Sequence, residues 1–237
     1  MDRTKTGIPG FDQLIQGGLP IGSSVVLGGG AGTGKSIFAM QFLYEGAKTF
    51  KEPGIFVTME TNARNIVWNM ESFGWDVKAM QEKELLKIYR LKFPHPLSHS
   101  KIEGAIENEL KVIGDMAKDM GAKRIVVDPT TSMIVWVDGL AHVRSVLYNF
   151  ANGLKDIGCT TLMTSETGQD KNQYSAFGVE AYIADAVVAL YFTPPHRSIF
   201  IRKMRHTEHS KNVHPIEIGK NGICTNPKET ILWEAVL

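Results

Sequence analysis

Apolar positions along the chain fall into two kinds of segment. Short runs rich in β-branched residues alternate with longer segments whose apolar residues recur at helical spacing. The runs that predict strands are 24–27, 55–59, 86–91, 125–128 and 160–165. The segments that predict helices are 35–49, 61–73, 102–120 and 143–157, with Thr61 as a cap of the second. Such alternation is typical of a parallel sheet with crossover helices.

The C-terminal part of the chain follows another pattern. The runs 186–192, 198–204 and 215–218 predict strands, and no long helical segment separates them. Strands joined so closely favour antiparallel pairing. The segment 92–101, with two prolines and two histidines, is expected to be a loop. We therefore expect an α/β fold, with a mostly parallel twisted sheet flanked by helices and antiparallel strands at its C-terminal end.

Length and charge narrow the classes of function. The chain has 237 residues, enough for one large α/β domain or at most two small ones. Its 26 basic and 25 acidic residues give a net charge of +1. This balance argues against a broad basic face for nucleic acid and against a polybasic membrane patch. A local basic cluster remains at 202–211.

The cysteine content argues against disulfide bonds and zinc, and the hydropathy argues against a signal peptide or a membrane span. Cys159 and Cys224 are too few for a disulfide framework or a cysteine-built zinc site. The first residues contain no hydrophobic signal core, and no apolar stretch approaches the roughly 20 residues of a membrane span. We expect a cytoplasmic protein.

The segment GGAGTGKS at 29–36 fits the phosphate-loop pattern G-x-x-x-x-G-K-[ST] without a mismatch. It follows a β-branched run and precedes a helix, which is the context that the pattern requires. Its glycines let backbone N–H groups point at phosphates, and the helix adds the positive end of its dipole. We expect Lys35 to contact the β- and γ-phosphates and Ser36 to ligate Mg²⁺. The positions expected to bind ATP or ADP are Gly29, Gly30, Ala31, Gly32, Thr33, Gly34, Lys35, Ser36 and Ile37.

Two acidic residues follow expected strands. Asp128 ends the apolar run 125–128, where phosphate-loop NTPases carry an acid that holds magnesium or its waters. The alternative is an aspartate that caps a turn before Pro129. Glu60 ends the segment IFVTME, where a carboxylate can orient or deprotonate the attacking water. The alternative there is a solvated glutamate at a strand end.

The segment KMRHTEHSK at 203–211 carries a cluster of basic side chains at a strand end. Alternation along a strand would put Lys203 and Arg205 on one face, so both could meet one phosphate group. An arginine supplied by a neighbouring subunit is a known way to stabilise charge in phosphoryl transfer. The alternative is a solvated basic edge strand that discourages aggregation.

Seven segments occur in the order seen in one family. They read TGIPGFDQLIQGGLP, GGAGTGKS, FVTME, RIVVDP, TLMTSE, FGVEAYIADAVVAL and KMRHTEHS. Along nearly its whole length the chain resembles the KaiC-like ATPases of the RecA superfamily. It looks like a single KaiC-type domain over 1–237, not the duplicated clock protein.

The resemblance implies a RecA-like phosphate-loop core that assembles into a ring, usually a hexamer, with ATP between subunits. It implies that Glu60 is the catalytic glutamate, although Thr61 stands where the family has a second acid. It implies that the pair Ser165 and Glu166 senses the γ-phosphate. It also implies a group that reaches the neighbouring subunit's nucleotide, consisting of Lys203, Arg205 and His209.

Three functions remain open from the sequence. The first is a Mg²⁺-dependent ATPase that works as a ring. The second is a nucleic-acid motor or recombinase with loops at 130–141 and 168–180. The loop 168–180 holds one Lys, one Asp and one Glu, which gives it too little positive charge to bind a phosphate backbone well. The third is a nucleotide-gated scaffold that recruits partner proteins, which near-neutral charge and Thr61 would fit.

Overall fold

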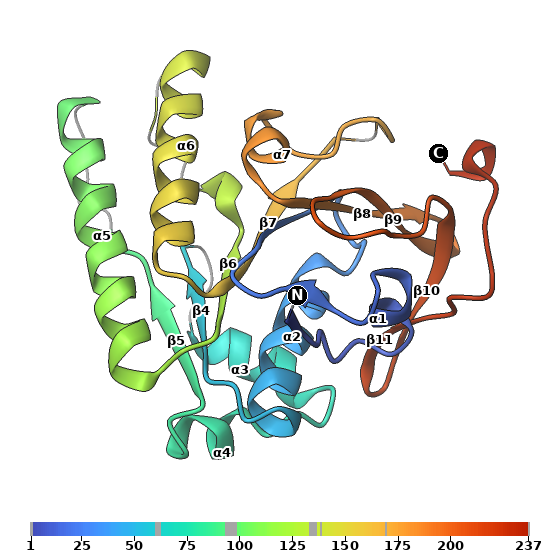
Figure 1. The fold of residues 1–237 in the computed structure, drawn as a ribbon, viewed down its shortest axis with the longest axis horizontal. Coiled ribbons are helices and arrows are strands. Elements are labelled where there is room, and N and C mark those ends of the chain that lie inside the picture. The colour runs from blue at the N-terminus through green and yellow to red at the C-terminus, as the bar shows by residue number, and fades with distance from the viewer. Residues whose placement is uncertain are drawn as a thin grey trace.

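A nine-stranded sheet forms the centre of the computed structural model, which describes residues 2–59, 63–92, 99–132, 137, 139–168 and 170–236. The order of its strands is β11-β10-β9-β8-β3-β7-β6-β4-β5 (Figure 1). The strands that pair in parallel are β3 (Ser24–Gly29), β4 (Gly54–Thr58), β5 (Leu86–Arg90), β6 (Arg124–Asp128), β7 (Thr160–Glu166) and β8 (Ala186–Thr193). Those that pair antiparallel are β9 (His196–Met204), β10 (Val213–Gly219) and β11 (Gly222–Thr225). The expected α/β fold is therefore confirmed.

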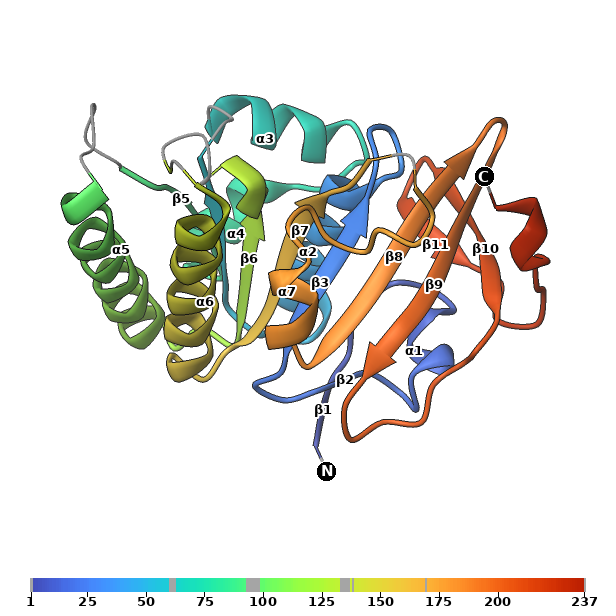
Figure 2. The ribbon, with the colours of Figure 1, turned by 90° about the horizontal axis from the view of Figure 1, so that it is seen from above.

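Helices cover both faces of this sheet (Figure 2). One face carries α2 (Lys35–Thr49), α3 (Ala63–Glu71) and α4 (Val77–Glu82), and the other carries α5 (His99–Met120), α6 (Leu140–Asp156) and α7 (Val179–Ile183). Neighbouring residues of a strand point to opposite faces. In β3, Leu27 packs with Phe38 of α2, whereas Val26 packs with the α5 and α6 side. Central strands are therefore apolar on both faces, as their sequences predict.

The N-terminal segment packs beside the C-terminal strands. It contains β1 (Arg3–Thr4), α1 (Phe11–Leu14) and β2 (Leu19–Pro20), and β1 pairs with β2 as a separate two-stranded sheet. A 3₁₀ turn at Trp233–Ala235 lies near the end of the described chain. In the described part of the chain, no helix combines the length and the apolarity that a membrane span requires.

Most long elements agree with the sequence prediction to within a few residues, and α2 agrees at both ends. The prediction of a loop over 92–101 is wrong at its C-terminal end, because α5 begins at His99. Residues 93–98 lie outside the described part of the chain, and so does Thr61, the predicted cap of the second helix. Polar residues are tolerated in a first helical turn, where N–H groups have no intrahelical partner. The short elements that the prediction missed are β1, β2, α1, α4, α7 and β11.

A buried arginine fixes α2 against the sheet. Arg124 of β6 is fully buried, donates from Nη1 to the Phe42 carbonyl oxygen at 2.8 Å, and forms an ion pair with Glu52 at 2.6 Å. Its guanidinium lies over the rings of Phe42 and Phe50. A Cβ atom at Gly46 would come within 2.5 Å of the Arg124 side chain, so glycine is required where helix and arginine meet. These contacts hold α2, which begins at the phosphate loop, in a fixed position relative to β6.

Candidate nucleotide site

The loop between β3 and α2 has the backbone shape that a phosphate-binding loop requires. Gly32 and Gly34 have φ values of +74° and +101°, a region that residues with a Cβ atom rarely adopt. A Cβ atom at Gly28, at the end of β3, would lie 2.0 Å from the Tyr174 carbonyl oxygen. Glycines are therefore needed both for the curl of the loop and for the close approach of a neighbouring segment.

Lys35 points back across this loop. Its ammonium donates to the Gly30 carbonyl oxygen at 2.8 Å, and the side chain is buried. Burial lowers the pKa of Lys35, and the carboxylates of Glu166 and Asp128 act in the opposite direction. The loop thus holds a cation that is partly removed from water and lies within the field of two acids.

The N-terminus of α2 lies directly after the loop. Its N-cap residue is Gly34, and no side chain caps the helix. Free N–H groups and the dipole of a 15-residue helix both favour an anion there. Ser36 is exposed in the first turn, and Ile37 is half-buried against the core. The structure thus brings the predicted nucleotide-binding positions of 29–37 together around one turn.

Asp128 lies at the C-terminal end of β6, at the same edge of the sheet as the phosphate loop. The Thr164 hydroxyl of β7 donates to Asp128 Oδ1, and both side chains are buried. The sequence analysis missed Thr164, because its partner is 36 residues away and no local pattern links the two. The hydrogen bond orients the carboxylate, which is the role of groups that surround metal ligands.

Ser165 and Glu166, at the end of β7, make different interactions. The buried Ser165 hydroxyl donates to Glu180 Oε1 of α7 at 3.0 Å and accepts from the Ala176 amide at 2.9 Å. Glu166 pairs with Gly29 in the parallel register of β3 and β7, and its charge raises the pKa of Lys35. Ser165 therefore contacts α7 and the segment before it, whereas Glu166 acts electrostatically on the phosphate loop.

Glu60 and Thr61 lie outside the described residues, so their roles remain predictions. The strand before them, β4, ends at Thr58, which is beside Asp128 in the register with β6. Parallel strands end at one edge of a sheet, where ligands bind in open α/β folds. β4 therefore ends at the edge of the sheet that carries the phosphate loop, two residues before Glu60 in the sequence.

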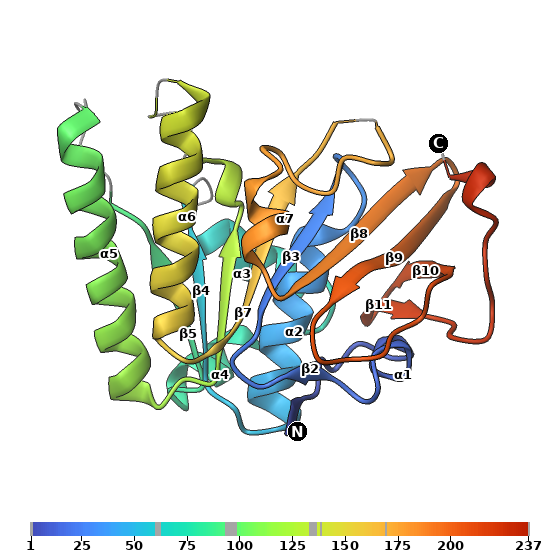
Figure 3. The same ribbon diagram turned by 45° about the horizontal axis from the view of Figure 1, so that its top comes forward.

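The basic residues of 203–209 lie away from this loop. β8 lies between β3 and β9 (Figure 3). In the register of β8, Lys203 pairs with Val187, whereas Leu190 is the residue beside Gly29 of β3. Three residues of strand separate these two positions, which is about 10 Å. Lys203 therefore occupies the opposite half of β8 and β9 from its own phosphate loop.

Lys203 and Arg205 line one pocket, as their spacing of two residues predicts. Lys203 lies in β9 and Arg205 follows the end of this strand, and the bulge in β9 comes before Lys203. Arg205 lies 3.6 Å from Asp185. His209 is not brought to this pocket: it contacts the Ser210 carbonyl oxygen and Lys211 Nζ beside a different one.

No group of three or more His, Cys, Asp or Glu side chains is arranged to hold a metal ion within the described ranges. Magnesium on a nucleotide takes one or two protein ligands together with phosphates and water. The Ser36 hydroxyl and the oriented Asp128 carboxylate fit that donor set, because both supply oxygen.

The strand, glycine loop and helix, placed on a mostly parallel sheet with an acid at the end of a neighbouring strand, define a phosphate-loop NTPase of the RecA type. The sequence matches the family described as "ATPase: KaiC" over residues 4–230. The chain belongs to this KaiC family.

Its relatives differ in length. The chain is 36% identical over 236 residues to the circadian clock oscillator protein KaiC of Parasynechococcus marenigrum, and the match covers 96% of this chain but 45% of that protein. It is 34% identical to UPF0273 protein PH0284 of Pyrococcus horikoshii, covering 99% of this chain and 98% of that protein. Among solved structures, the KaiC-like protein PH0186 of Pyrococcus horikoshii superimposes with a TM-score of 0.82 at 38% identity, covering 94% and 98% of the two chains. The chain thus spans about half the length of the clock proteins that it matches.

Proposed function

We propose that this chain, as a single KaiC-type domain over 1–237, binds ATP with Mg²⁺ and hydrolyses it. The observation that carries the proposal is the position of Lys35, whose buried ammonium lies across a glycine loop at the start of α2. A buried ammonium across a glycine loop is suited to a multiply charged anion such as a nucleoside triphosphate, and the carboxylates of Glu166 and Asp128 favour its charged form. Membership of an ATPase family supports the same reaction.

Each residue of the nucleotide site has its own role in the proposed hydrolysis. Lys35 and the N–H groups of the loop and of α2 hold the phosphates. Ser36 and Asp128 supply oxygen ligands for Mg²⁺, which neutralises phosphate charge when bound. Glu60 orients or deprotonates the attacking water.

We propose further that the protein works as a homo-oligomeric ring, with six subunits expected from the family. Lys203 and Arg205 are too far from their own phosphate loop to serve it, so they would serve the loop of a neighbour, with His209 on the following segment. A site built from two different faces is a heterologous contact, and such contacts close into rings or continue as filaments. The family favours the ring.

The test is Lys35→Ala, with Lys48→Ala as the matched control, because Lys48 is an exposed lysine at the other end of α2. Binding is measured by calorimetry with ATP, and turnover by phosphate release. We expect Lys35→Ala to lose both and Lys48→Ala to keep both. Unchanged ATP affinity and hydrolysis in Lys35→Ala would refute the proposal.

A nucleotide-gated scaffold is the second candidate, because Thr61 stands where the family has an acid. It predicts ATP binding and ring formation with negligible turnover, so the same phosphate-release assay separates it from the first.

A nucleic-acid motor is less favoured. Lys171, the one lysine of the 168–180 segment, donates to the Trp233 carbonyl oxygen and lies over its ring. Salt-dependent DNA binding would revive that candidate.

A further inference from the structure

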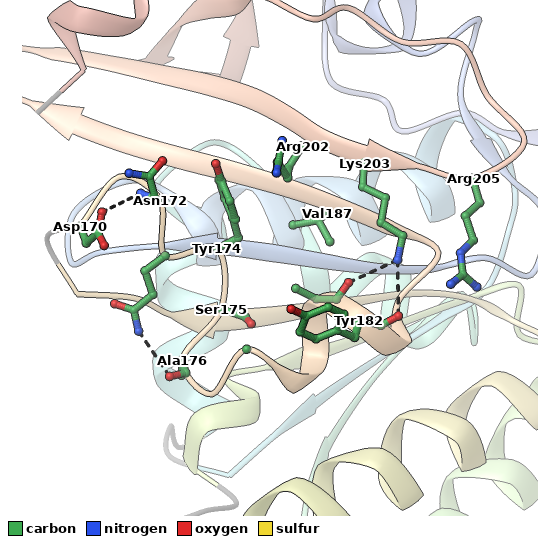
Figure 4. Close-up of a pocket in the computed structure, with 13 residues that line it drawn as sticks. Asp170, Asn172, Tyr174, Ser175, Ala176, Tyr182, Val187, Arg202, Lys203 and Arg205 are labelled. Carbon is green, nitrogen blue, oxygen red and sulfur yellow. Dashed lines mark hydrogen bonds between the residues drawn. The ribbon is translucent and has the colours of Figure 1, made fainter.

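The loop 205–212 joins β9 to β10 and carries Arg205 and His209. Lys203 precedes the loop in β9, and its side chain and that of Arg205 extend to the same side of the strand (Figure 4). All residues of the loop are described, and none of them belongs to a helix or strand. The loop therefore lacks the hydrogen bonds of regular structure, and its position depends on contacts with other parts of the chain.

Arg3 of β1 connects this loop to the N-terminal segment. Its Nη1 donates to the Thr207 hydroxyl at 3.0 Å, from 204 positions away in the sequence. The same guanidinium donates to three oxygens of the turn 15–18: the carbonyl oxygens of Gly18 at 2.8 Å and Ile15 at 3.3 Å, and Gln16 Oε1 at 3.2 Å. One side chain therefore joins the turn 15–18 to the loop 205–212.

Two further contacts join the loop to the N-terminal segment. The Glu208 amide donates to Gln16 Oε1 at 3.2 Å, so this oxygen accepts from the guanidinium and from the loop together. The Ser210 amide donates to the Leu14 carbonyl oxygen at 2.9 Å. These two contacts hold the backbone of the loop on either side of His209.

The backbone of the turn 15–18 has the shape that these contacts require. Gln16 has a φ of +54°, in the left-handed region that residues with a Cβ atom rarely adopt. A Cβ atom at Gly18 would lie 2.5 Å from the Thr4 carbonyl oxygen and 3.4 Å from Arg3 Cβ, so glycine lets β1 approach the turn. Backbone in such uncommon conformations persists where the surroundings hold it and is frequent beside functional sites.

An arginine is well suited to hold two segments together. The four oxygens that accept from Arg3 are uncharged, and hydrogen bonds from a charged donor are stronger than those between neutral groups. The guanidinium is planar and rigid, so it fixes the positions of its acceptors relative to one another better than a lysine ammonium can.

The Arg3 contacts lie away from the phosphate loop of the same chain. Arg3 pairs with Pro20 of β2, shortly before β3 begins at Ser24. The phosphate loop follows the other end of β3, at Gly29. Loss of the Arg3 side chain therefore leaves the contacts of the chain's own phosphate loop in place.

We propose that Arg3 and Gln16 are positioning residues for the loop 205–212 and hold Arg205 and His209 where they meet the nucleotide of a neighbouring subunit. The catalytic consequence rests on the proposed function, since it requires the ring. A group that stabilises charge has to lie at the right distance, and a misplacement of about 1 Å can cost about 100-fold in rate. The N-terminal segment of one subunit thereby affects hydrolysis in the next.

Two variants test the proposal. Arg3→Met removes the guanidinium, whereas Thr207→Val removes only its acceptor on the loop. Thr207→Val leaves the hydrogen bonds of Arg3 to the turn 15–18 in place, so it separates support of the loop from support of the N-terminal turn. It also tests the proposal if Arg3→Met fails to fold. The control is Lys5→Met, which removes one positive charge from an exposed position of the same segment.

The first measurement is hydrogen exchange of the amides of 205–212 in the absence of nucleotide. We expect exchange to be about 5- to 10-fold faster in Arg3→Met and Thr207→Val, the scale of one lost hydrogen bond, and unchanged in Lys5→Met. This result does not depend on ATP hydrolysis. Exchange at the wild-type rate in both variants would overturn the proposal.

The second measurement is ATP hydrolysis and ADP affinity. We expect kcat to fall by about tenfold or more in Arg3→Met and Thr207→Val, with ADP affinity within about twofold of wild type, because each variant keeps its own phosphate loop. Mixing then locates the defect: Thr207→Val should gain activity with Lys35→Ala and gain none with Arg205→Ala. A general loss of stability would not distinguish between these two partners.

Failure of this proposal differs from failure of the proposed function. If wild type hydrolyses ATP and both variants match its kcat, the positioning role is overturned and the proposed function stands. If wild type does not hydrolyse ATP, the proposed function is overturned, and hydrogen exchange alone decides whether Arg3 holds the loop.

Discussion

The Lys203 ammonium donates to the Ala184 carbonyl oxygen at 2.7 Å, at the end of α7. The carbonyl oxygens of Ala181 and Tyr182 accept from it at 3.3 and 3.4 Å. An ammonium has three N–H groups, so these contacts use all of them. Lys203 therefore stabilises α7 in this chain, and any contact with a neighbour's phosphate has to replace at least one of these hydrogen bonds.

Lys203→Met and Arg205→Ala are therefore expected to differ in stability. Loss of the Lys203 hydrogen bonds should lower the free energy of unfolding by about 1 kcal/mol. Arg205→Ala removes a half-exposed ion pair and should cost less than about 0.5 kcal/mol. Urea unfolding measures both, and phosphate release is expected to fall in both variants. Equal stability of the two variants would contradict the capping role of Lys203.

Glu60→Gln is expected to leave ATP bound while lowering hydrolysis by about 100-fold or more, the scale of lost general-base assistance. The amide keeps the size of the side chain but cannot accept the proton of water. Calorimetry with ATP and phosphate release measure the two effects. Glu71→Gln, an exposed position at the end of α3, is the control. Hydrolysis by Glu60→Gln at the wild-type rate would mean that another residue positions the water.

Thr164→Val is expected to raise the Mg²⁺ concentration needed for half-maximal hydrolysis by about 10- to 100-fold, the usual cost of removing a group that orients a metal ligand. Valine has nearly the same shape but leaves Asp128 without the Thr164 hydrogen bond. Thr161→Val is the matched control, since this buried threonine of β7 donates to the Cys159 carbonyl oxygen away from the site. An identical Mg²⁺ requirement in the two variants would rule out this role for Thr164.

Asp185→Asn is expected to lower stability in a pH-dependent way. Burial alone would raise the pKa of Asp185, but hydrogen bonds from Lys155 and Ser24 outweigh it, so the folded-state pKa lies below the ordinary 3.8. The carboxylate therefore stabilises the fold fully above about pH 3.8, and this contribution disappears as the pH falls through the lower folded-state value.

We expect Asp185→Asn to cost about 1–2 kcal/mol at neutral pH, with the difference from wild type shrinking in acid. Urea unfolding in steps from neutral to about pH 3 measures it. Asp156→Asn, at an exposed position near the end of α6, serves as control. A difference that grows as the pH falls would contradict the assignment.

The phosphate loop and its helix were predictable because their signals are local. The glycines, the lysine and the apolar spacing of α2 all lie within 29–49, and the structure keeps those bounds. Asp128 was predictable for the same reason, since it ends a continuous apolar strand. Each of these predictions needs only neighbouring residues and the edge at which parallel strands end.

The rest of the candidate site depends on contacts between distant residues. Thr164 meets Asp128, and Ser165 meets Glu180, only once β6, β7 and α7 are in place. The bulge before Lys203 follows from the pairing of β9 with β8, which no spacing within β9 reveals. The short helix α4 did carry a local signal, because the Asp76 side chain caps it by accepting from the Ala79 amide.

The last prediction concerns assembly: Arg205→Ala and Lys35→Ala, each inactive alone, should recover part of the hydrolysis when mixed. In a ring with composite sites, a mixed interface pairs the intact phosphate loop of one variant with the intact Arg205 of the other. The structure supports this arrangement. Lys203 of β9 pairs with Val187, which lies about 10 Å along β8 from Leu190, the residue beside Gly29. Arg205 follows Lys203 in the chain and lies farther still from Gly29. Subunit exchange is verified first by mass measurement of differently tagged variants, and phosphate release is then followed across mixing ratios. Activity should be greatest near equal amounts, where mixed interfaces are most frequent. Proven exchange without recovery would contradict a site completed in trans, as would a monomer that hydrolyses ATP at a rate independent of its concentration.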